Sequence, residues 1–209
     1  MTMRITLIGM SGVGKTLWAK KLETAGFVRY SVDDFIEDKL HDEMKKHGFK
    51  GIHHVSKWMG QPFHERYSKR SKRYLELERK SLEEIIKLVK QSTNDNIVID
   101  TTGSVIYLDR HILDELSKLT KIIYLKTSED SVEQMKQKYF EDPKPVIWGD
   151  IFHLRSNETS EGALRRCYPA LLSYRNEKYA EHSHLKIQDH ILYKEEFDHQ
   201  KFLEYIKKG

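Results

Sequence analysis

Cysteine and long apolar runs are scarce in this sequence. Its 209 residues include one cysteine, Cys167, so no disulfide can form within the chain, as is typical of proteins of the reducing cytoplasm. No stretch approaches the roughly 18 consecutive apolar residues of a membrane-spanning helix. The apolar part of the N-terminal segment MTMRITLIGM is too short for a signal peptide, and no small-residue cleavage site follows it. We therefore expect a cytoplasmic protein without a membrane partner.

Apolar residues as a whole are also few. Hydrophobic types make up 38% of the chain and charged types 33%, which argues against a large all-β core and suits a soluble protein with long, solvated helices. The length fits a single domain, residues 1–209, with room for a small lid or insertion. The formal net charge of +4 is a mild excess. It would help to attract a phosphorylated ligand but does not identify nucleic acid as the partner.

The densest basic cluster is KRSKR at residues 69–73. Two acids, Glu76 and Glu78, follow it closely in the sequence. We interpret the cluster and these acids as a solvated helix face. The alternative is a surface that contacts nucleic acid, which we do not favour.

Short apolar runs alternate with longer segments in which apolar residues recur at helical spacing. Strands are expected at residues 5–8, 27–32, 97–100, 121–125 and 185–187, and helices at residues 16–25, 33–47, 63–89, 108–119, 129–140, 161–182 and 195–207. Residues 49–62 are expected to be irregular or short-helical. This alternation predicts an α/β fold with a parallel sheet covered on both faces. Because ligands of such sheets bind beyond the carboxyl ends of the strands, the polar residues that follow the strands are candidates for a site.

A phosphate-binding motif follows the first expected strand. Residues 9–16 are GMSGVGKT and fit the full P-loop pattern. Its glycines let the loop curl so that backbone N–H groups face phosphate oxygens, and the helix that begins near Lys15 adds its positive end. We expect Lys15 to reach the β- and γ-phosphates and the Thr16 hydroxyl to hold Mg²⁺. The predicted nucleotide-binding residues are Gly9, Ser11, Gly12, Val13, Gly14, Lys15 and Thr16.

Two acids, Asp33 and Asp34, follow the second expected strand. A carboxylate at that place would face the phosphate loop, where it could orient an acceptor hydroxyl or take its proton. We assign this catalytic and substrate-binding role to Asp33, with Asp34 as a second substrate-binding candidate. The alternative is that both acids merely cap the next helix and stabilise its first turn, where acids are generally favoured.

A third carboxylate, Asp100, closes the apolar run IVID. An aspartate at the end of such a strand is typical of a Walker B position, in which a carboxylate holds Mg²⁺ or its water ligands. Thr101, Thr102 and Gly103 then form a turn whose N–H and hydroxyl groups could contact a polar substrate; an ordinary strand-to-loop turn is the alternative. We predict Asp100 as a metal residue acting through water, and Thr102 and Gly103 as substrate-binding residues.

With these residues the chain resembles the shikimate kinase family of P-loop small-molecule kinases, over most of its length from residue 3 to about residue 187. The matching segments are residues 9–16, 33–37, 74–78, 101–103, 144–147 and 171–179. The chain departs from the family at Ser31, where the family has an aspartate, and at Leu75, where it has an arginine. The glycine turn at residues 101–103 is only partly kept. The phosphate site thus fits the family better than the acceptor pocket does.

The resemblance implies a three-layer P-loop fold whose five parallel strands have the order 2-3-1-4-5. It also implies a substrate-binding region at residues 34–94 and a lid at residues 141–160. Lys144 belongs to the lid motif and would cover the phosphates as a catalytic point charge. A planar arginine could also act on the transferring phosphoryl group, and the candidates are Arg155, Arg165 and Arg166.

Arg175 lies in a pattern L-x-x-x-R-x-x-x-Y that the family carries on a late helix. The resemblance implies that Arg175 anchors an acidic or phosphorylated group of the substrate. The alternative is a surface arginine that pairs with Glu177 or Glu181 on the same helix.

The combined expectation is an ATP-dependent phosphotransferase, with Mg²⁺ as cofactor, that acts on a hydroxyl of a small and possibly anionic metabolite. Its acceptor pocket should differ from that of a shikimate kinase because Leu75 replaces an arginine. Two alternatives stay open, a kinase acting on nucleotides or nucleic-acid ends and a non-catalytic regulatory module that binds ATP. The sequence does not distinguish ATP from GTP as the preferred nucleotide, nor a monomer from a homodimer.

Overall fold

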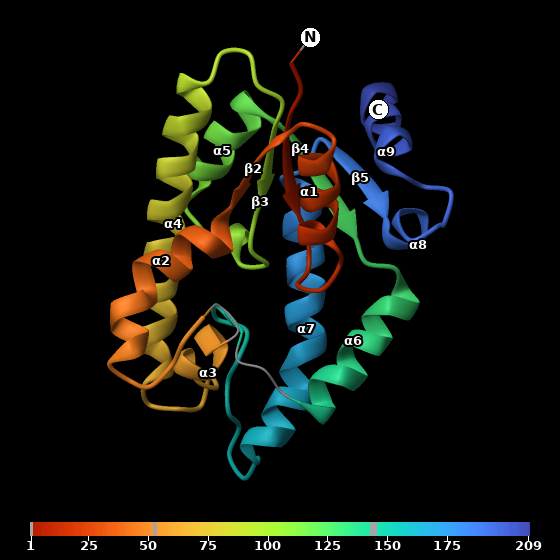
Figure 1. The fold of residues 1–209 in the computed structure, drawn as a ribbon. Coiled ribbons are helices and arrows are strands. Elements are labelled where there is room, and N and C mark those ends of the chain that lie inside the picture. The colour runs from red at the N-terminus through yellow and green to blue at the C-terminus, as the bar shows by residue number, and fades with distance from the viewer. Residues whose placement is uncertain (1, 52–53, 143–145) are drawn as a thin grey trace.

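A computed structural model describes residues 2–51, 54–142 and 146–209. Its five strands form one parallel sheet in the order β2-β3-β1-β4-β5, with helices on both faces (Figure 1). The strands are β1 (Arg4–Ile8), β2 (Val28–Ser31), β3 (Ile97–Asp100), β4 (Lys121–Lys126) and β5 (Leu185–Gln188). This arrangement confirms the α/β class, the P-loop architecture and the strand order expected from the sequence.

Helices connect the strands and follow the last one. They are α1 (Lys15–Thr24), α2 (Val32–Lys45), α3 (Val55–Met59), α4 (Tyr67–Gln91), α5 (Arg110–Leu119), α6 (Glu129–Glu141), α7 (Ser160–Glu181), α8 (Asp189–Leu192) and α9 (His199–Lys208), together with a 3-10 turn, η2 (Val105–Tyr107). Every expected helix is present with shifted ends, α3 lies in the segment expected to be irregular or short-helical, and α8 and η2 were not expected. In the part of the chain that the structure describes, no helix combines the length and apolarity needed to cross a bilayer.

The side chains of the sheet pack into two hydrophobic cores, because successive residues of a strand face opposite sides of the sheet. In β1, Ile5 and Leu7 enter the core that α1 and α9 close, whereas Ile8 enters the core on the other face. Within the first core, Trp18 of α1 stacks on Phe202 of α9 with ring centroids 4.6 Å apart. The other core receives apolar residues of α2, α4, α5 and α7. The result is the three-layer arrangement that the alternation of strands and helices predicts.

An aromatic cluster continues the second core past the carboxyl ends of the strands. Tyr139 of α6 stacks on Tyr168 of α7 with centroids 3.8 Å apart, and Trp148 lies edge-on to both rings. The Tyr67 hydroxyl at the start of α4 donates to the carbonyl of Val146 at 2.8 Å. It accepts a hydrogen bond from the backbone N–H of Trp148 at 2.9 Å. These bonds fix the segment after residue 145 against α4, on one side of the site described below.

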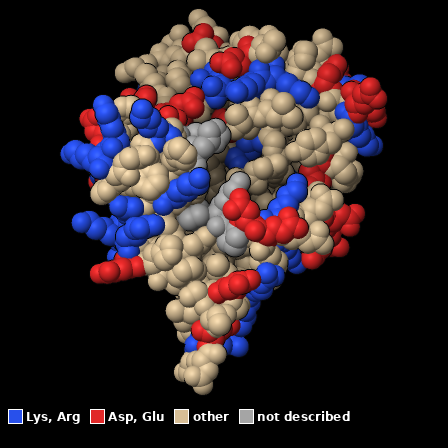
Figure 2. Space-filling view, turned by 60° about the horizontal axis from the view of Figure 1, so that its bottom comes forward, with Lys and Arg blue, Asp and Glu red and all other residues tan. Residues whose placement is uncertain are grey.

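The prediction of a solvated face on α4 is confirmed for part of the basic cluster and is wrong for Glu78. Basic and acidic side chains are interspersed on the face of the molecule that Figure 2 shows. Arg73 of α4 pairs with Glu43 at 3.3 Å and with Glu76 at 3.1 Å. Glu78, however, is completely buried. It follows Tyr74 by four residues, and this spacing puts it on the buried stripe of the helix rather than on the solvated one.

We expect Phe202→Ala to lower the free energy of unfolding by about 3–5 kcal/mol, because it removes a fully buried ring that stacks on Trp18 and leaves a cavity. Urea-induced unfolding followed by tryptophan fluorescence measures the change. Tyr205→Ala is the matched control on the same helix: Tyr205 is 37% exposed, and its loss should cost less than about 1 kcal/mol. Equal losses in the two variants would contradict the role of α9 in closing this core.

Candidate active site

The phosphate loop joins β1 to α1 in a backbone conformation that requires glycine. Gly9 has φ 146°, and a Cβ atom there would lie 2.6 Å from the carbonyl oxygen of Leu125. Gly14, with φ 101°, is the N-cap of α1 and provides no side-chain cap for the helix. The first N–H groups of α1 therefore have no capping side chain, which leaves them available to an anion at the positive end of the helix.

Lys15 lies under this loop and closes it. Its Nζ atom donates to the carbonyls of Gly9 and Met10, both at 2.9 Å. Burial lowers the pKa of Lys15, and the nearby carboxylates of Asp100 and Asp33 oppose that shift. The ammonium is thus positioned at the phosphate loop, with two acids nearby that favour its charged form.

Asp100 and Thr16 form a site that fits a magnesium ion. Burial raises the pKa of the Asp100 carboxyl group, and the nearby Thr16 hydroxyl and the charge of Lys15 oppose that shift. The Asp100 Oδ1 atom is buried and has no hydrogen-bond partner among the described residues. Mg²⁺ prefers a few oxygen ligands and keeps several waters, so a hydroxyl, an unsatisfied carboxylate oxygen and nucleotide phosphates suit it. No larger cluster of acids, histidines or cysteines suited to a metal occurs in the described ranges.

Asp33 and Asp34 occupy the first turn of α2 but face different surroundings. The N-cap is Ser31, whose hydroxyl accepts the N–H of Asp34 at 3.3 Å. Asp33 lines a cavity that lies beyond the carboxyl ends of the strands, and burial raises its pKa while Lys15 opposes the shift. The Asp34 carboxylate is 64% exposed, pairs with Arg29 at 3.4 Å and does not line the cavity. Asp33 alone of the two is placed to contact a ligand there.

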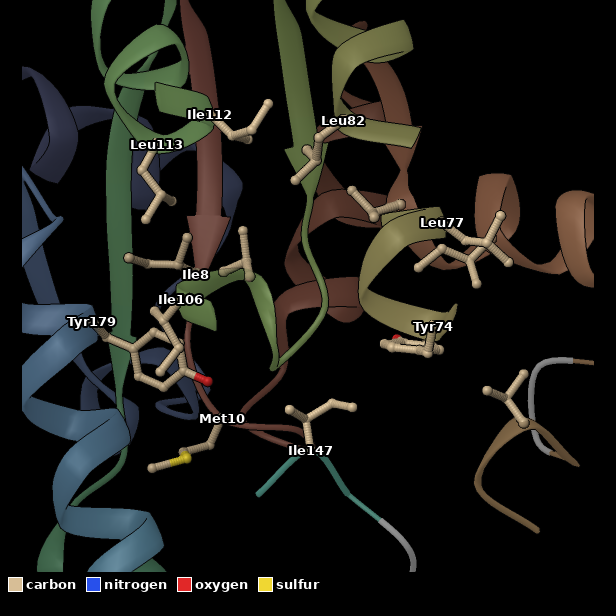
Figure 3. Packing of buried hydrophobic residues seen from close by; sticks show 14 of the residues in the cluster. Ile8, Met10, Tyr74, Leu77, Leu82, Ile106, Ile112, Leu113, Ile147 and Tyr179 are labelled. Carbon is tan, nitrogen blue, oxygen red and sulfur yellow. The ribbon is translucent and has the colours of Figure 1, made fainter. Parts of the chain in front are cut away.

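One cavity of about 400 Å³ lies beyond the carboxyl ends of the strands. Of the predicted site residues, it brings together Ser11, Gly12, Gly14, Lys15, Thr16, Asp33, Thr102, Gly103 and Arg175. Its other lining residues are Leu17, Val55, Ser56, Met59, Tyr74, Thr101, Ser104, Val146 and Ile147. Figure 3 shows Tyr74 and Ile147 below the sheet on this side of the core. Gly9, Val13 and Asp100 support the loop and the metal position rather than the cavity wall, and Lys144 lies outside the described residues.

Arg175 is buried in the cavity wall instead of lying on the surface, so a surface pair with Glu177 or Glu181 is excluded. Its guanidinium donates to the carbonyl of Ile147 at 2.6 Å and to the Tyr107 hydroxyl at 3.4 Å, and it lies 5.5 Å from the centroid of the Tyr107 ring. Within the described ranges it forms no ion pair with a carboxylate. A buried guanidinium without a counter-ion is suited to bind an anionic group of a ligand.

Glu78 is a site residue that the sequence did not single out. It accepts a hydrogen bond from the Thr102 hydroxyl and another from the Ser104 hydroxyl at 2.7 Å. Both hydroxyls line the cavity, with Glu78 directly behind them. Burial raises its pKa to about 7, against the hydrogen bonds of these two hydroxyls. The signal available in the sequence was its spacing of four residues from Tyr74, on the apolar stripe of α4.

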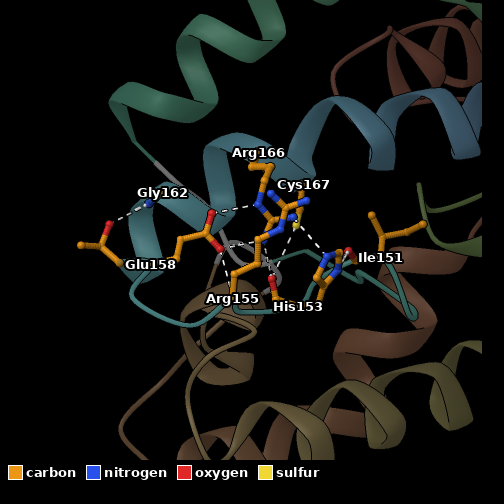
Figure 4. A network of polar contacts seen from close by, with 8 residues as sticks. Ile151, His153, Arg155, Glu158, Gly162, Arg166 and Cys167 are labelled. Atoms are coloured by element: carbon orange, nitrogen blue, oxygen red, sulfur yellow. Dashed lines mark hydrogen bonds and ion pairs between the residues drawn. The ribbon is translucent and has the colours of Figure 1, made fainter.

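The candidate arginines of the lid region do not line the cavity in this structure. Arg166 pairs with Glu158 at 2.7 Å and donates to the carbonyl of His153 at 2.8 Å (Figure 4). Arg165 pairs with Glu161 at 2.9 Å. The backbone N–H of Arg155 donates to Glu158 at 3.2 Å. Arg165 and Arg166 thus bond to acids through their side chains and Arg155 through its backbone, and none of the three lines the cavity.

Comparison with known proteins supports the fold and no closer relationship. The shikimate kinase of Bacteroides thetaiotaomicron is 18% identical with a TM-score of 0.60 and covers 98% of both chains. The shikimate kinase of Acinetobacter baumannii in complex with shikimate is 20% identical with a TM-score of 0.60, over 99% of this chain and 94% of that one. The dephospho-CoA kinase of Campylobacter jejuni is 12% identical with a TM-score of 0.53, over 98% and 96%. No family model matches the sequence, and no curated protein matches it significantly.

The fold is therefore that of the P-loop kinases, and it is shikimate-kinase-like over nearly the whole chain. This confirms the resemblance at the level of the fold. At such identities the acceptor that each neighbour uses does not carry over to this chain.

Glu78 should make stability depend on pH. The pKa of Glu78 is about 7 in the folded protein, above its ordinary value of 4.5. The stability that Glu78 contributes is therefore present below about pH 4.5 and is lost as the pH rises through 7. The shift corresponds to about 3 kcal/mol. We expect the free energy of unfolding of Glu78→Gln, measured relative to the unsubstituted protein by urea titration, to rise by roughly this amount from pH 5 to pH 8. A difference that does not change with pH would contradict the raised pKa.

Proposed function

We propose that this protein is an ATP-dependent kinase that transfers the γ-phosphoryl group to a hydroxyl of a small anionic metabolite. The observation that carries the proposal is the joint lining of one cavity by the phosphate-loop residues Lys15 and Thr16, by Asp33 and by the unpaired guanidinium of Arg175. These are the parts that phosphoryl transfer needs: a phosphate clamp, a group for the acceptor hydroxyl and an anchor for the acceptor.

The nucleotide side of the proposal rests on the loop and the start of α1. The N–H groups of the loop and the Lys15 ammonium would bind the β- and γ-phosphates and stabilise their charge during transfer. Thr16 and Asp100 would hold Mg²⁺, the latter through water. Bound Mg²⁺ would neutralise phosphate charge, while the chain itself supplies positioning and exclusion of water.

The acceptor side rests on Asp33 and Arg175. Asp33 would orient the acceptor hydroxyl or take its proton, and its raised pKa makes its carboxylate a stronger base. Arg175 would hold an acidic or phosphorylated group of the acceptor, with Thr102 and Gly103 forming part of the same wall. Asp34, which pairs with Arg29, is not part of the proposed pocket.

We also propose a single kinase domain in which residues 34–94 form the acceptor-binding region and residues 141–160 the lid. Val55, Met59 and Tyr74 from the first region and Ile147 from the second line the cavity and support this division. Lys144 would cover the phosphates as a point charge when the lid closes, and cytoplasmic ATP would supply the phosphoryl group.

ADP release from MgATP, measured with purified protein over a panel of hydroxylated metabolites that includes shikimate, tests the function. Acceptor-dependent release that Lys15→Ala abolishes supports the proposed kinase. Turnover of oligonucleotide ends, with binding that weakens as salt rises, would favour a nucleic-acid kinase instead. ATP binding with no release on any acceptor would favour a regulatory ATP-binding module.

Asp33→Asn should lower kcat by about 10²–10⁴-fold and leave MgATP affinity nearly unchanged, because it removes the proton acceptor and keeps the phosphate loop. Steady-state kinetics and nucleotide titration measure the two effects. Asp38→Asn is the matched control, since Asp38 is an exposed acid on the same helix, and its kinetics should equal those of the unsubstituted protein. A similar kcat for the two variants would exclude Asp33 from the reaction.

A further inference from the structure

The cavity has a polar floor in which two hydroxyl groups bind one buried carboxylate. Tyr74, Thr102 and Ser104 line this floor, and Glu78 lies fully buried behind them; we call these four residues the floor cluster. Thr102 and Ser104 each donate their hydroxyl proton to a different oxygen of Glu78, and the Thr102 hydroxyl oxygen also accepts the backbone N–H of Ser104 at 3.0 Å. The Tyr74 side chain lines the same floor.

The direction of these bonds decides what the floor offers a ligand. A hydroxyl carries one proton, and an ionised carboxylate only accepts. Because Thr102 and Ser104 give their protons to Glu78, neither hydroxyl has a proton left for a ligand. The Ser104 oxygen therefore offers the cavity lone pairs and no proton, so a ligand group that bonds to it must be a hydrogen-bond donor.

The charges around the cavity decide which donor fits. The acids are Asp33, Glu78 and Asp100, and the cations are Lys15 and Arg175. Lys15 is bonded to the phosphate loop and Arg175 to the carbonyl of Ile147. Glu78 is completely buried and forms no ion pair with any residue that the structure describes, although the charge of Arg175 lies near enough to lower its pKa. A buried carboxylate without a counter-ion is costly, and a ligand cation would offset that cost.

From this arrangement, and resting on the proposed kinase function, we propose that the acceptor carries a protonated amine that binds the floor cluster, beside the hydroxyl that is phosphorylated. The amine donates to the hydroxyl oxygens of Tyr74 and Ser104, and its charge is balanced by Glu78 one hydrogen bond further on. An ammonium has three donors and no acceptor, so it suits a floor of acceptors. A neutral hydroxyl would form the bonds but leave the charge of Glu78 unbalanced.

Together with an anionic group on Arg175, the amine makes the acceptor a small amino-hydroxy acid. Glu78 is then a positioning residue, because it does not contact the acceptor and acts through the hydroxyls of Thr102 and Ser104. Its negative charge sets their orientation and selects an acceptor with a cation above them.

Matched acceptors that differ only in the amine test this proposal. L-homoserine is compared with 4-hydroxybutyrate, and L-serine with 3-hydroxypropionate, by acceptor-dependent ADP release near pH 8, where Glu78 is ionised. We expect kcat/KM of an amine-bearing member to exceed that of its amine-free partner by about tenfold or more, as for a hydrogen bond to a charged group. Shikimate serves as a further acceptor without nitrogen.

Glu78→Gln keeps the shape of the side chain and removes its charge. It should reduce the preference for the amine to within about threefold, mainly through a higher KM for the amine-bearing acceptor, and leave KM for MgATP unchanged. Glu76→Gln is the matched control, an acid on the same helix that pairs with Arg73 and Lys80 at the surface, and it should keep the full preference. Ser104→Ala provides a second variant of the floor should Glu78→Gln fail to fold.

The outcomes separate this inference from the kinase function. Turnover of shikimate or of the amine-free partners at rates equal to those of the amines would overturn the inference and still support a kinase. A preference for the amine that survives both Glu78→Gln and Ser104→Ala would overturn the role of the floor cluster. ATP binding without ADP release on any acceptor would overturn the kinase and the inference together.

Discussion

The parallel register of β2, β3 and β1 aligns the parts of the site at one edge of the sheet. Ser31, Asp100 and Leu7 are paired neighbours across these strands, and each lies at or beside the point where the chain leaves the sheet. The backbone N–H and hydroxyl of Thr101 both donate to the carbonyl of Leu7, at 3.4 and 2.7 Å. The turn after β3 is thus tied to the strand that feeds the phosphate loop. A slip of one residue would send Asp100 to the opposite face and separate it from Thr16.

Bringing these strand ends together also concentrates buried charge. Burial works against the charged form of Lys15, Asp33 and Asp100, and their mutual attraction works in the opposite direction. The ionisation of each group therefore depends on the presence of the others. A ligand that brings phosphates to Lys15 and a metal to Asp100 enters a site whose dipoles and charges are already positioned, so little reorganisation is needed when charge moves during transfer.

Local patterns in the sequence were sufficient for the five strands, the longer helices and the phosphate loop, since apolar runs, helical spacing and the loop glycines each depend on neighbouring residues. The order of the strands in the sheet came from the resemblance to a known family. Local patterns were not sufficient where a side chain is defined by contacts distant in sequence. Glu78 was placed on a solvated face because its buried partners, Thr102 and Ser104, lie 24 and 26 residues away. Glu158, the acid that pairs with Arg166, precedes α7 and therefore does not follow from helical spacing. Asp34 differs from Asp33 only in helix phase, which a pair of adjacent acids does not reveal.

The departure at Leu75 and the floor of the cavity have one physical explanation. The resemblance to shikimate kinases places an arginine at this position, three residues before Glu78 and therefore within reach of it along the helix. Leucine cannot supply that charge, and Leu75 instead packs against the hydrophobic core. The Glu78 carboxylate has hydroxyls in place of a cation, from the same turn that in the family is glycine-rich. Leu75 thus supplies no charge beside Glu78, and Thr102 provides a neutral donor that keeps the carboxylate hydrogen-bonded while its charge remains available to a ligand.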